Sequence, residues 1–175
     1  LESAEVLPKV VIPVHFAGQA CAMQELAELA KQYNFKVIED ASHAIGGEYL
    51  TGKVGNCQFS DMTVFSFHPV KIITTAEGGM VTTNSKELYE KLKLYRSHGI
   101  TRDAELLLDK EVGPWYYEQQ LLGFNYRMTD MQAALGFSQL QRVDTFVAKR
   151  RELVARYNEI LQELPLTRPY QEPET

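Results

Sequence analysis

The feature that most constrains the fold of this chain is a strand–helix–strand pattern in its first 40 residues. Residues 10–16, "VVIPVHF", are β-branched and apolar and predict a strand, in which Pro13 favours a strand end or an unpaired edge position. Residues 20–33 place apolar side chains at helical spacing, and residues 36–40, "KVIED", predict a short buried strand ending in two acids. Because this unit builds parallel sheets, we expect an α/β fold with a mainly parallel sheet flanked by helices.

Further elements follow along the chain. Residues 46–56 contain four glycines and predict a loop or hairpin, while residues 62–67 and 80–83 predict strands. Asn84 with Glu87 three residues later predicts the start of a helix that runs to about residue 96. The aromatic, irregular stretch that comes next, residues 101–126, is typical of a functional or interface loop.

The last predicted element is a long helix. Thr129 with Gln132 resembles a capping box, and apolar residues continue at helical spacing to Leu164. Such a helix would be about 50 Å long at 1.5 Å per residue. We therefore expect it to protrude from the domain or to join two domains.

Composition excludes several classes of function. The chain has 175 residues, 45% hydrophobic and 23% charged, with a formal net charge of −5, as in ordinary globular proteins. No basic block predicts nucleic-acid binding, no apolar run approaches a membrane span, and no signal peptide opens the chain. Cys21 and Cys57 lack metal-ligand spacing, so we expect no metal site and reduced thiols, as in a cytoplasmic protein.

An acid and a lysine stand at the ends of two predicted strands. Asp40 ends one strand, and Lys71 follows the next within "SFHPVKIITTAEGGMV", residues 66–81. Parallel sheets bind ligands beyond the carboxyl ends of their strands, so both side chains can face one crevice. Pyridoxal phosphate matches this pair, because its aldehyde bonds to a lysine and its pyridinium nitrogen pairs with a carboxylate. The Ser66 hydroxyl would then suit the phosphate.

The residues alone leave simpler interpretations open. A single lysine in a loop is usually a solvated surface residue, and an acid at a strand end is often a helix cap or turn former. His43 can be a buried core histidine, and the same alternative holds for His68 and His98, whereas His15 is a candidate for lining the site. No glycine-rich nucleotide-binding motif occurs.

Three longer motifs carry a family resemblance. "VIEDASHAIGG", "FSFHPVKIITTAEGGMV" and "LGFNYRMTDMQAALGFSQL" together resemble the DegT/StrS-like sugar-nucleotide aminotransferases, a branch of the fold-type I pyridoxal phosphate enzymes. The similarity runs from about residue 10 to about residue 164. Within that family, "VHFAGQ" and "EDASHAIGG" are most similar to the aminotransferases of pseudaminic acid biosynthesis.

The resemblance implies a role for five residues. Lys71 would be the catalytic lysine that bonds to pyridoxal phosphate, and Asp40 would pair with the pyridinium nitrogen. His43 would lie against the cofactor ring, and Ser66 would bind its phosphate. Asn125, in "GFNYR", would reach the phosphate of a neighbouring subunit, which implies a homodimer with shared sites.

The resemblance also implies a substrate and a domain division. The reaction would move an amino group from glutamate to C4 of a UDP-linked 4-keto-6-deoxy-N-acetylhexosamine. Residues 1–126 would be part of the cofactor-binding large domain, and residues 127–175 would hold the long connecting helix and the start of an absent small domain.

The resemblance implies that family members are longer, and we expect the given sequence to cover neither their N-terminal phosphate-binding turn nor their small second domain. Three hypotheses follow: part of an aminotransferase, a short enzyme completed by an oligomer or partner, or a non-catalytic module that mediates oligomerisation or interaction.

Overall fold

The computed structural model describes residues 6–109 and 113–173. The chain divides into two compact units: Leu1–Asn84 together with Asp130–Thr175, and Ser85–Thr129. The first unit contains the main sheet and the last two helices, and the second contains one helix and a short strand pair.

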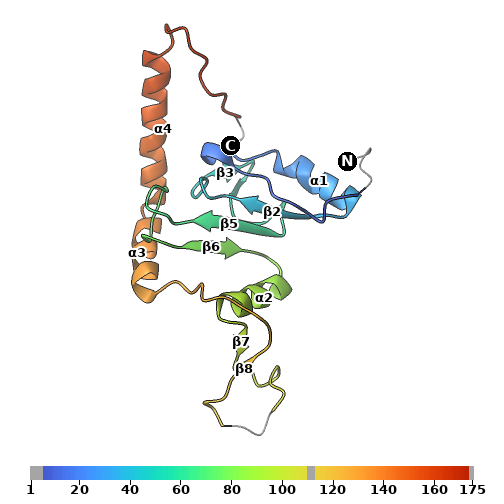
Figure 1. The fold of residues 1–175 in the computed structure, drawn as a ribbon. Helices are drawn as coiled ribbons and strands as arrows, with labels where there is room; N and C mark the ends of the chain where they lie inside the picture. The colour runs from blue at the N-terminus through green and yellow to red at the C-terminus, as the bar shows by residue number, and fades with distance from the viewer. Residues whose placement is uncertain (1–5, 110–112, 174–175) are drawn as a thin grey trace. The chain divides into compact units, whose positions relative to one another are not determined.

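The first unit is built on a four-stranded sheet in the order β1 (Val10–Val11), β2 (Lys36–Asp40), β5 (Met62–Ser66) and β6 (Gly79–Thr82). The first three strands are parallel, and β6 is antiparallel to β5 (Figure 1). Helix α1 (Met23–Tyr33) connects β1 to β2. The predicted α/β fold with a mainly parallel sheet is therefore confirmed.

The first strand is much shorter than the sequence predicts. It ends at Val11, and beyond Pro13 only an isolated bridge from Val14 to Asp40 continues the pairing. Proline has no amide hydrogen to donate to a ladder, which explains the early end. The chain then makes a 3-10 turn, Phe16–Gly18, in which Ala17 has the left-handed φ of 55°.

The glycine-rich segment forms the predicted hairpin. Strands β3 (Glu48–Tyr49) and β4 (Gly52–Lys53) pair antiparallel. The buried residues Met23, Phe35 and Val37 form a hydrophobic cluster. Cys21 and Cys57 are free thiols.

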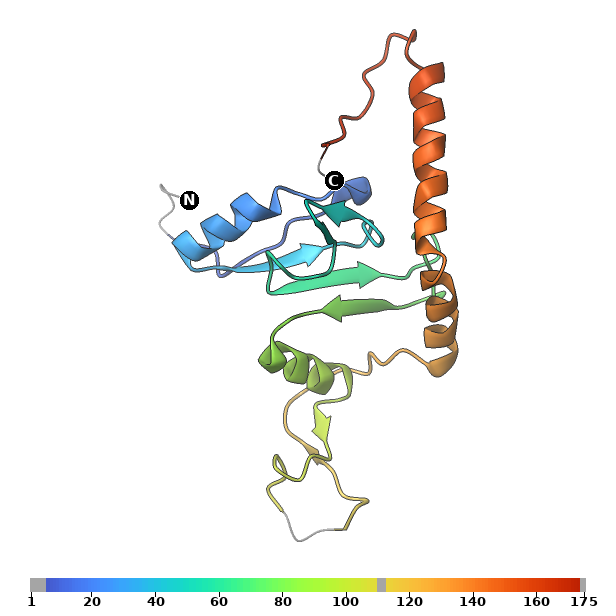
Figure 2. The same ribbon diagram turned by 180° about the vertical axis from the view of Figure 1, so that it is seen from behind.

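The single long helix predicted after residue 129 is two helices. Helix α3 (Asp130–Leu140) and helix α4 (Val143–Ile160) are separated at Arg142, whose φ of −114° and ψ of 5° are not helical. Neither glycine nor proline marks this break, so the sequence pattern could not reveal it. Both helices stand at the end of the sheet where β5 ends and β6 begins (Figure 2).

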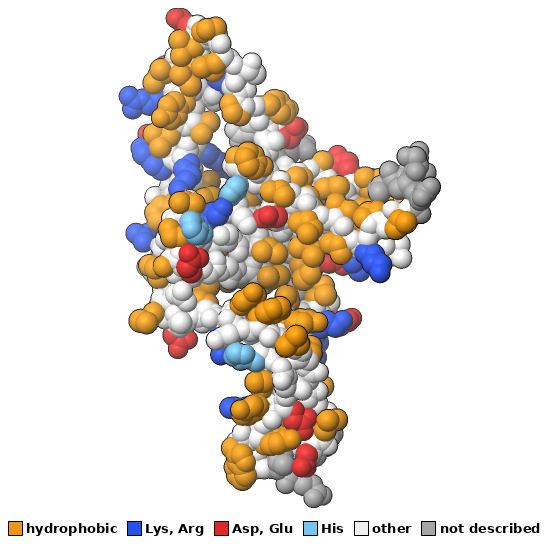
Figure 3. Space-filling view, in the orientation of Figure 1, with side chains coloured by type: hydrophobic (Ala, Val, Ile, Leu, Met, Phe, Trp, Pro, Cys, Tyr) orange, Lys and Arg blue, Asp and Glu red, His pale blue; other side chains and the backbone are white. Residues whose placement is uncertain are grey.

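Much of the apolar surface of these two helices is exposed. On α4 the side chains of Leu153, Val154, Tyr157 and Ile160 are between 45% and 62% exposed. The space-filling view shows hydrophobic side chains along this helix (Figure 3). Among the described helices, none is long and apolar enough to cross a membrane.

The second unit begins with helix α2 (Lys86–Arg96), close to its predicted bounds. Its N-cap is Ser85 rather than Asn84, because the Ser85 hydroxyl oxygen accepts a hydrogen bond from the Leu88 backbone amide. Asn84 donates instead to the backbone oxygen atoms of Asn56 and Cys57. Strands β7 (Ile100–Thr101) and β8 (Glu118–Gln119) pair antiparallel, and most of the aromatic stretch is irregular, as expected.

The two faces of the central strands differ in burial. Along β2, Val37 and Glu39 are buried, whereas Ile38 and Asp40 on the opposite face are half-buried. Asp40 pairs with Val64 in β5, and paired residues of neighbouring strands lie on the same face of a sheet. Along a strand, every second residue lies on the same face. Ser66, two residues beyond Val64, therefore lies on the same face as Asp40.

The buried face contains a polar network around Glu39. The Glu39 carboxylate accepts hydrogen bonds from His15 Nε2 at 2.8 Å, from the Thr63 hydroxyl at 2.9 Å and from the Ser60 hydroxyl. His15 and Thr63 are 0% exposed, and Glu39 is 6% exposed. A buried carboxylate is tolerated only when hydrogen bonds replace its hydration, as they do here.

The network determines the ionisation of Glu39. Burial by itself raises the pKa of a carboxyl group, but the hydrogen bonds from His15, Ser60 and Thr63 outweigh it and lower the pKa of Glu39 below its ordinary value. A carboxyl group whose folded-state pKa is depressed adds stability above its unfolded pKa. That contribution is lost as the pH falls through the lower, folded-state value.

We predict that Glu39→Gln removes this pH-dependent contribution. The difference in free energy of unfolding between wild type and variant should be largest above about pH 5 and should shrink below about pH 4, close to the ordinary glutamate pKa. Urea denaturation across this range measures it. The exposed Glu25→Gln on α1 is the control, and a difference that stays constant with pH would contradict the prediction.

Candidate functional site

The predicted site residues at the strand ends lie close together in the first unit. Asp40 ends β2, Ser66 ends β5, and Lys71 follows β5 in the loop that leads to β6. Asp40, Ser66 and Lys71 are each half-buried. Since β2 and β5 are parallel neighbours, their carboxyl ends meet at one edge of the sheet, as the sequence predicts for a ligand site.

Asp40 is surrounded by groups that favour its charged form. The Ser42 side chain is the main cause that lowers the pKa of Asp40 below its ordinary value, and the Ser42 backbone amide, 3.0 Å from Oδ1, adds to it. Partial burial opposes this, while electrostatic interactions with His43 and Lys71 lower the pKa further. Asp40 therefore remains a carboxylate at neutral pH, within electrostatic reach of both His43 and Lys71.

Lys71 is close to Asp40 without being bonded to it. Its backbone amide donates to the His68 carbonyl oxygen at 3.0 Å, which closes a turn directly after β5. Within the described ranges 6–109 and 113–173, the Lys71 side chain makes no hydrogen bond or ion pair. An amine and a carboxylate that lie within electrostatic reach without pairing fit a ligand with an electrophilic carbon and a cationic nitrogen.

His43 lies beside the turn that follows β1. Its Nδ1 accepts a hydrogen bond from the Ala17 amide at 3.3 Å, and its ring meets the Phe16 ring edge-on, with centroids 5.8 Å apart. An Nδ1 that accepts leaves the hydrogen of the neutral ring on Nε2. Ser66 Oγ accepts from the His68 amide at a long 3.4 Å, so its hydrogen can be donated elsewhere.

The fifth predicted residue, Asn125, belongs to the second unit. It forms an isolated antiparallel bridge with Ser97 at the end of α2, and its side chain is exposed. The flanking residues Phe124 and Tyr126 donate backbone hydrogen bonds to Tyr95 and Arg96, and their rings stack with centroids 4.9 Å apart. These contacts fix the backbone on either side of Asn125 within this unit.

His15 does not line the candidate site, as the sequence suggested it could. Its ring is completely buried within the fold and bonded to Glu39.

Helix α3 holds the loop that contains Lys71, and the sequence analysis missed this. The side-chain amide of Gln139 accepts from the Thr74 amide at 3.2 Å and donates to the Thr74 oxygen at 2.7 Å. Gln132 donates to the Glu77 oxygen at 3.0 Å. Between them, Gly136 is so close to Thr75 that an added Cβ would lie 2.7 Å from its methyl group.

A signal for this contact was present in the sequence. Gln132, Gly136 and Gln139 are spaced i, i+4 and i+7, so they share one face of a helix. Two amides flanking a glycine on a helix face suit close packing against backbone. Only the fold identifies residues 74–77 as the backbone they contact.

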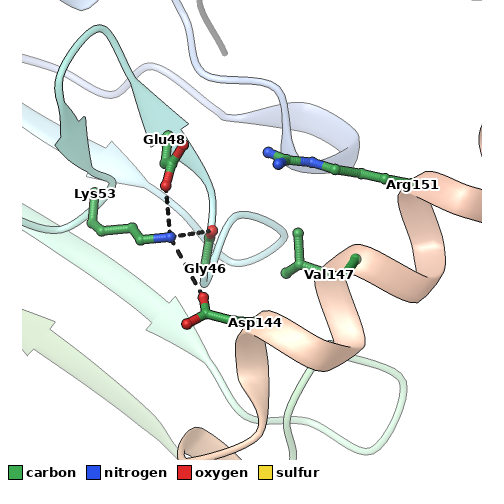
Figure 4. Close-up of a pocket in the computed structure, with 7 residues that line it drawn as sticks. Gly46, Glu48, Lys53, Asp144, Val147 and Arg151 are labelled. Carbon is green, nitrogen blue, oxygen red and sulfur yellow. Dashed lines mark hydrogen bonds and ion pairs between the residues drawn. The ribbon is translucent and has the colours of Figure 1, made fainter.

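A concave region lies between the β3–β4 hairpin and α4. This groove has a volume of about 560 Å³, and its charged lining residues include Glu48, Lys53, Asp144 and Arg151 (Figure 4). Lys53 Nζ lies 2.8 Å from Glu48 and 3.5 Å from Asp144. Because these charges pair with one another across the groove, they link α4 to the hairpin. Among the described residues, no cluster of three potential metal ligands occurs.

Comparison with known proteins gives a consistent family. The model of the DegT/DnrJ/EryC1/StrS aminotransferase family matches residues 3–175. A UDP-4-amino-4,6-dideoxy-N-acetyl-beta-L-altrosamine transaminase of Campylobacter jejuni is 46% identical over 145 residues, 83% of this chain and 36% of the relative. A GDP-perosamine synthase of Caulobacter vibrioides is 42% identical over 93% of this chain and 41% of the relative.

Solved structures agree with this. Helicobacter pylori PseC, an aminotransferase involved in the biosynthesis of pseudoaminic acid, has a TM-score of 0.79 and 38% identity over 88% of this chain and 38% of its own. The PLP form of a putative sugar aminotransferase, Spr1654 of Streptococcus pneumoniae, has a TM-score of 0.79 and 29% identity over 95% of this chain and 45% of its own. The chain spans about two fifths of the length of the curated relatives it matches.

We predict that Gln139→Leu loosens the Lys71 loop. The variant loses both hydrogen bonds to Thr74 and should lower the free energy of unfolding by about 1–3 kcal/mol. Hydrogen exchange of the Thr74 amide should also become faster. The control is Gln141→Leu, an exposed position between α3 and α4. Unchanged exchange at Thr74 in Gln139→Leu would contradict the assignment.

Proposed function

Because this chain belongs to the DegT/DnrJ/EryC1/StrS aminotransferase family, we propose that it is part of a pyridoxal phosphate-dependent enzyme that aminates a nucleotide-linked sugar. The amino group would pass from glutamate to C4 of a UDP-linked 4-keto-6-deoxy-N-acetylhexosamine. This substrate is supported by the names of the Campylobacter jejuni transaminase and of Helicobacter pylori PseC. The observation that carries the proposal is an unpaired amine, Lys71, within electrostatic reach of the ionised Asp40 at one sheet edge.

The residues present fit pyridoxal phosphate. Asp40 is held as a carboxylate, which suits a protonated ring nitrogen. Lys71 offers an amine with no competing hydrogen bond among the described residues, which suits a covalent bond to an aldehyde carbon. Ser66 supplies a hydroxyl on the same sheet face as Asp40 for the phosphate.

When bound, pyridoxal phosphate would supply a ring that withdraws electrons and so makes a C–H bond of the amino donor acidic. Lys71 Nζ would take the proton from that carbon and return it to another carbon, which is the step that general acid–base catalysis accelerates. Asp40 would keep the ring nitrogen protonated throughout. His43 would limit the position of the ring, because its own orientation is fixed by Ala17 and Phe16.

We further propose that two copies share their sites, with Asn125 of one copy reaching the cofactor phosphate of the other. The exposure of Asn125 and its fixed backbone support this role. The exposed apolar surface of α3 and α4 favours association as well. It also supports the alternative of a non-catalytic module whose purpose is association alone.

We predict that the chain mixed with pyridoxal phosphate develops the visible band of the lysine-bound cofactor at about 420 nm. Lys71→Ala should abolish this band, while the exposed Lys36→Ala should retain it. Absorbance titration measures both. Glutamate should then bleach the wild-type band, because transamination removes the cofactor from the lysine. A stable dimer that shows no lysine-dependent band would favour the non-catalytic module.

We predict that Asp40→Asn weakens cofactor function more than folding. The variant retains the size of the side chain but loses the charge, so the glutamate-dependent bleaching should slow by at least about tenfold. The free energy of unfolding should change by less than about 1 kcal/mol. Stopped-flow absorbance and urea denaturation measure these two effects. Equal losses of folding and of bleaching would mark Asp40 as structural.

A further inference from the structure

We propose that His15 is a positioning residue, whose buried ring anchors the segment Val14–Gly18 and through it orients both Asp40 and His43. The two latter residues are the proposed partners of the cofactor ring, so the consequence for binding rests on the proposed function. The orientation of His43 itself does not, because it can be observed in the cofactor-free chain.

The hydrogen bonds of the His15 ring leave it one orientation. Its Nδ1 accepts from the Cys21 amide at 3.2 Å, and its Nε2 lies 2.8 Å from Glu39 Oε2. Since Nδ1 is an acceptor, Nε2 carries the hydrogen and donates it to the carboxylate. Both ring nitrogens are therefore used inside the fold, where the side chain is 0% exposed.

The backbone of this segment, together with the preceding Pro13, bonds to both the amide and the carbonyl oxygen of Asp40. The His15 amide donates to the Asp40 oxygen at 3.0 Å, and the Asp40 amide donates to the Pro13 oxygen at 2.9 Å. The side chain of His15 meanwhile bonds to Glu39, the residue directly before Asp40. His15 is thus joined to two consecutive residues of β2, one through its ring and one through its backbone.

Two residues further on, the segment holds His43. The Ala17 amide donates to His43 Nδ1 at 3.3 Å, and the Phe16 ring meets the His43 ring edge-on. Ala17 and Gly18 have φ of 55° and 96°, and the left-handed region is unfavourable for alanine. A turn with such a residue persists only when its surroundings hold it, and the His15 ring directly before it is the buried anchor.

The packing around Gly18 makes this turn sensitive to small shifts. A Cβ at Gly18 would lie 3.1 Å from the His43 backbone oxygen, so the turn runs close to the His43 backbone as well as to its ring. A displacement of the anchored segment would therefore move the Ala17 amide away from Nδ1. His43 would lose its single orientation and tautomer, and Asp40 would lose both backbone partners together.

The test compares His15→Leu, which removes both ring hydrogen bonds, with His15→Gln, which keeps an amide donor for Glu39. The control is Phe35→Leu, which disturbs a buried side chain just before β2, at the opposite end of that strand from Asp40. Two readouts are taken after circular dichroism has established that each variant folds. They are the ¹⁵N NMR signals of the His43 ring in the cofactor-free chain, assigned with His43→Asn, and the Kd of pyridoxal phosphate from the visible band.

We expect His15→Leu to convert the His43 signals from one tautomer to a mixture. It should also raise the Kd of pyridoxal phosphate about tenfold. This is the scale on which losing a hydrogen bond that orients a ligand-binding residue reduces affinity. His15→Gln should lie between His15→Leu and wild type, and Phe35→Leu should match wild type in both readouts.

A folded His15→Leu with unchanged His43 signals and unchanged Kd would overturn the proposal, as would an equal loss in Phe35→Leu. If His15→Leu does not fold, the test rests on His15→Gln. Wild-type His43 signals and a wild-type Kd in His15→Gln would then overturn the proposal. A wild-type chain that binds no pyridoxal phosphate would refute the proposed function. The His43 signals would then still decide whether His15 positions this edge of the sheet.

Discussion

The structure of the first unit depends on one buried carboxylate. Glu39 accepts hydrogen bonds from three segments that are distant in sequence: from His15 in the segment after β1, from Ser60 before β5, and from Thr63 within β5. A buried charge without partners is strongly unfavourable, so these segments are held together wherever Glu39 is ionised. The adjacent residue, Asp40, points to the opposite face of the strand. The consecutive residues Glu39 and Asp40 thus provide a structural acid on one face of β2 and a candidate functional acid on the other.

The residues of the candidate site and the residues that support them form two layers near Glu39 and Asp40. The layer that would face a ligand consists of Asp40, His43, Ser66 and Lys71, contributed by the ends of two parallel strands and the loops that follow. The supporting layer consists of His15 with Glu39 on one side and the Gln132–Gly136–Gln139 face of α3 on the other. The supporting groups bond largely to backbone, so their effect is to fix the positions from which the first layer projects. Such precision is what a covalent, ring-binding cofactor demands of its site.

Several elements could be predicted from sequence because their signals are local. The strand at residues 36–40 and the helices α1 and α2 follow from runs and periodicities a few residues long, and the structure reproduces them within a few residues. The errors have both local and long-range causes. The strand predicted at residues 10–16 ends at Val11 because Pro13 has no amide hydrogen for the ladder. The cap of α2 is Ser85 because Asn84 is bonded to residues 56 and 57, far from it in sequence. The break at Arg142 separates a helix that clamps Thr74 from one that packs beside Gly46.

By itself the sequence determined the α/β class, the family and the residue types of the candidate site. These are encoded in short motifs, each of which can be read without knowing what lies opposite. Only the tertiary structure decided that Asp40 and Lys71 come within electrostatic reach, that His15 is a buried anchor, and that α3 holds the Lys71 loop. The physical reason is that each of these contacts joins residues 24 to 65 positions apart or depends on which face of a strand is buried. Such contacts exist only once the sheet and its helices have packed together.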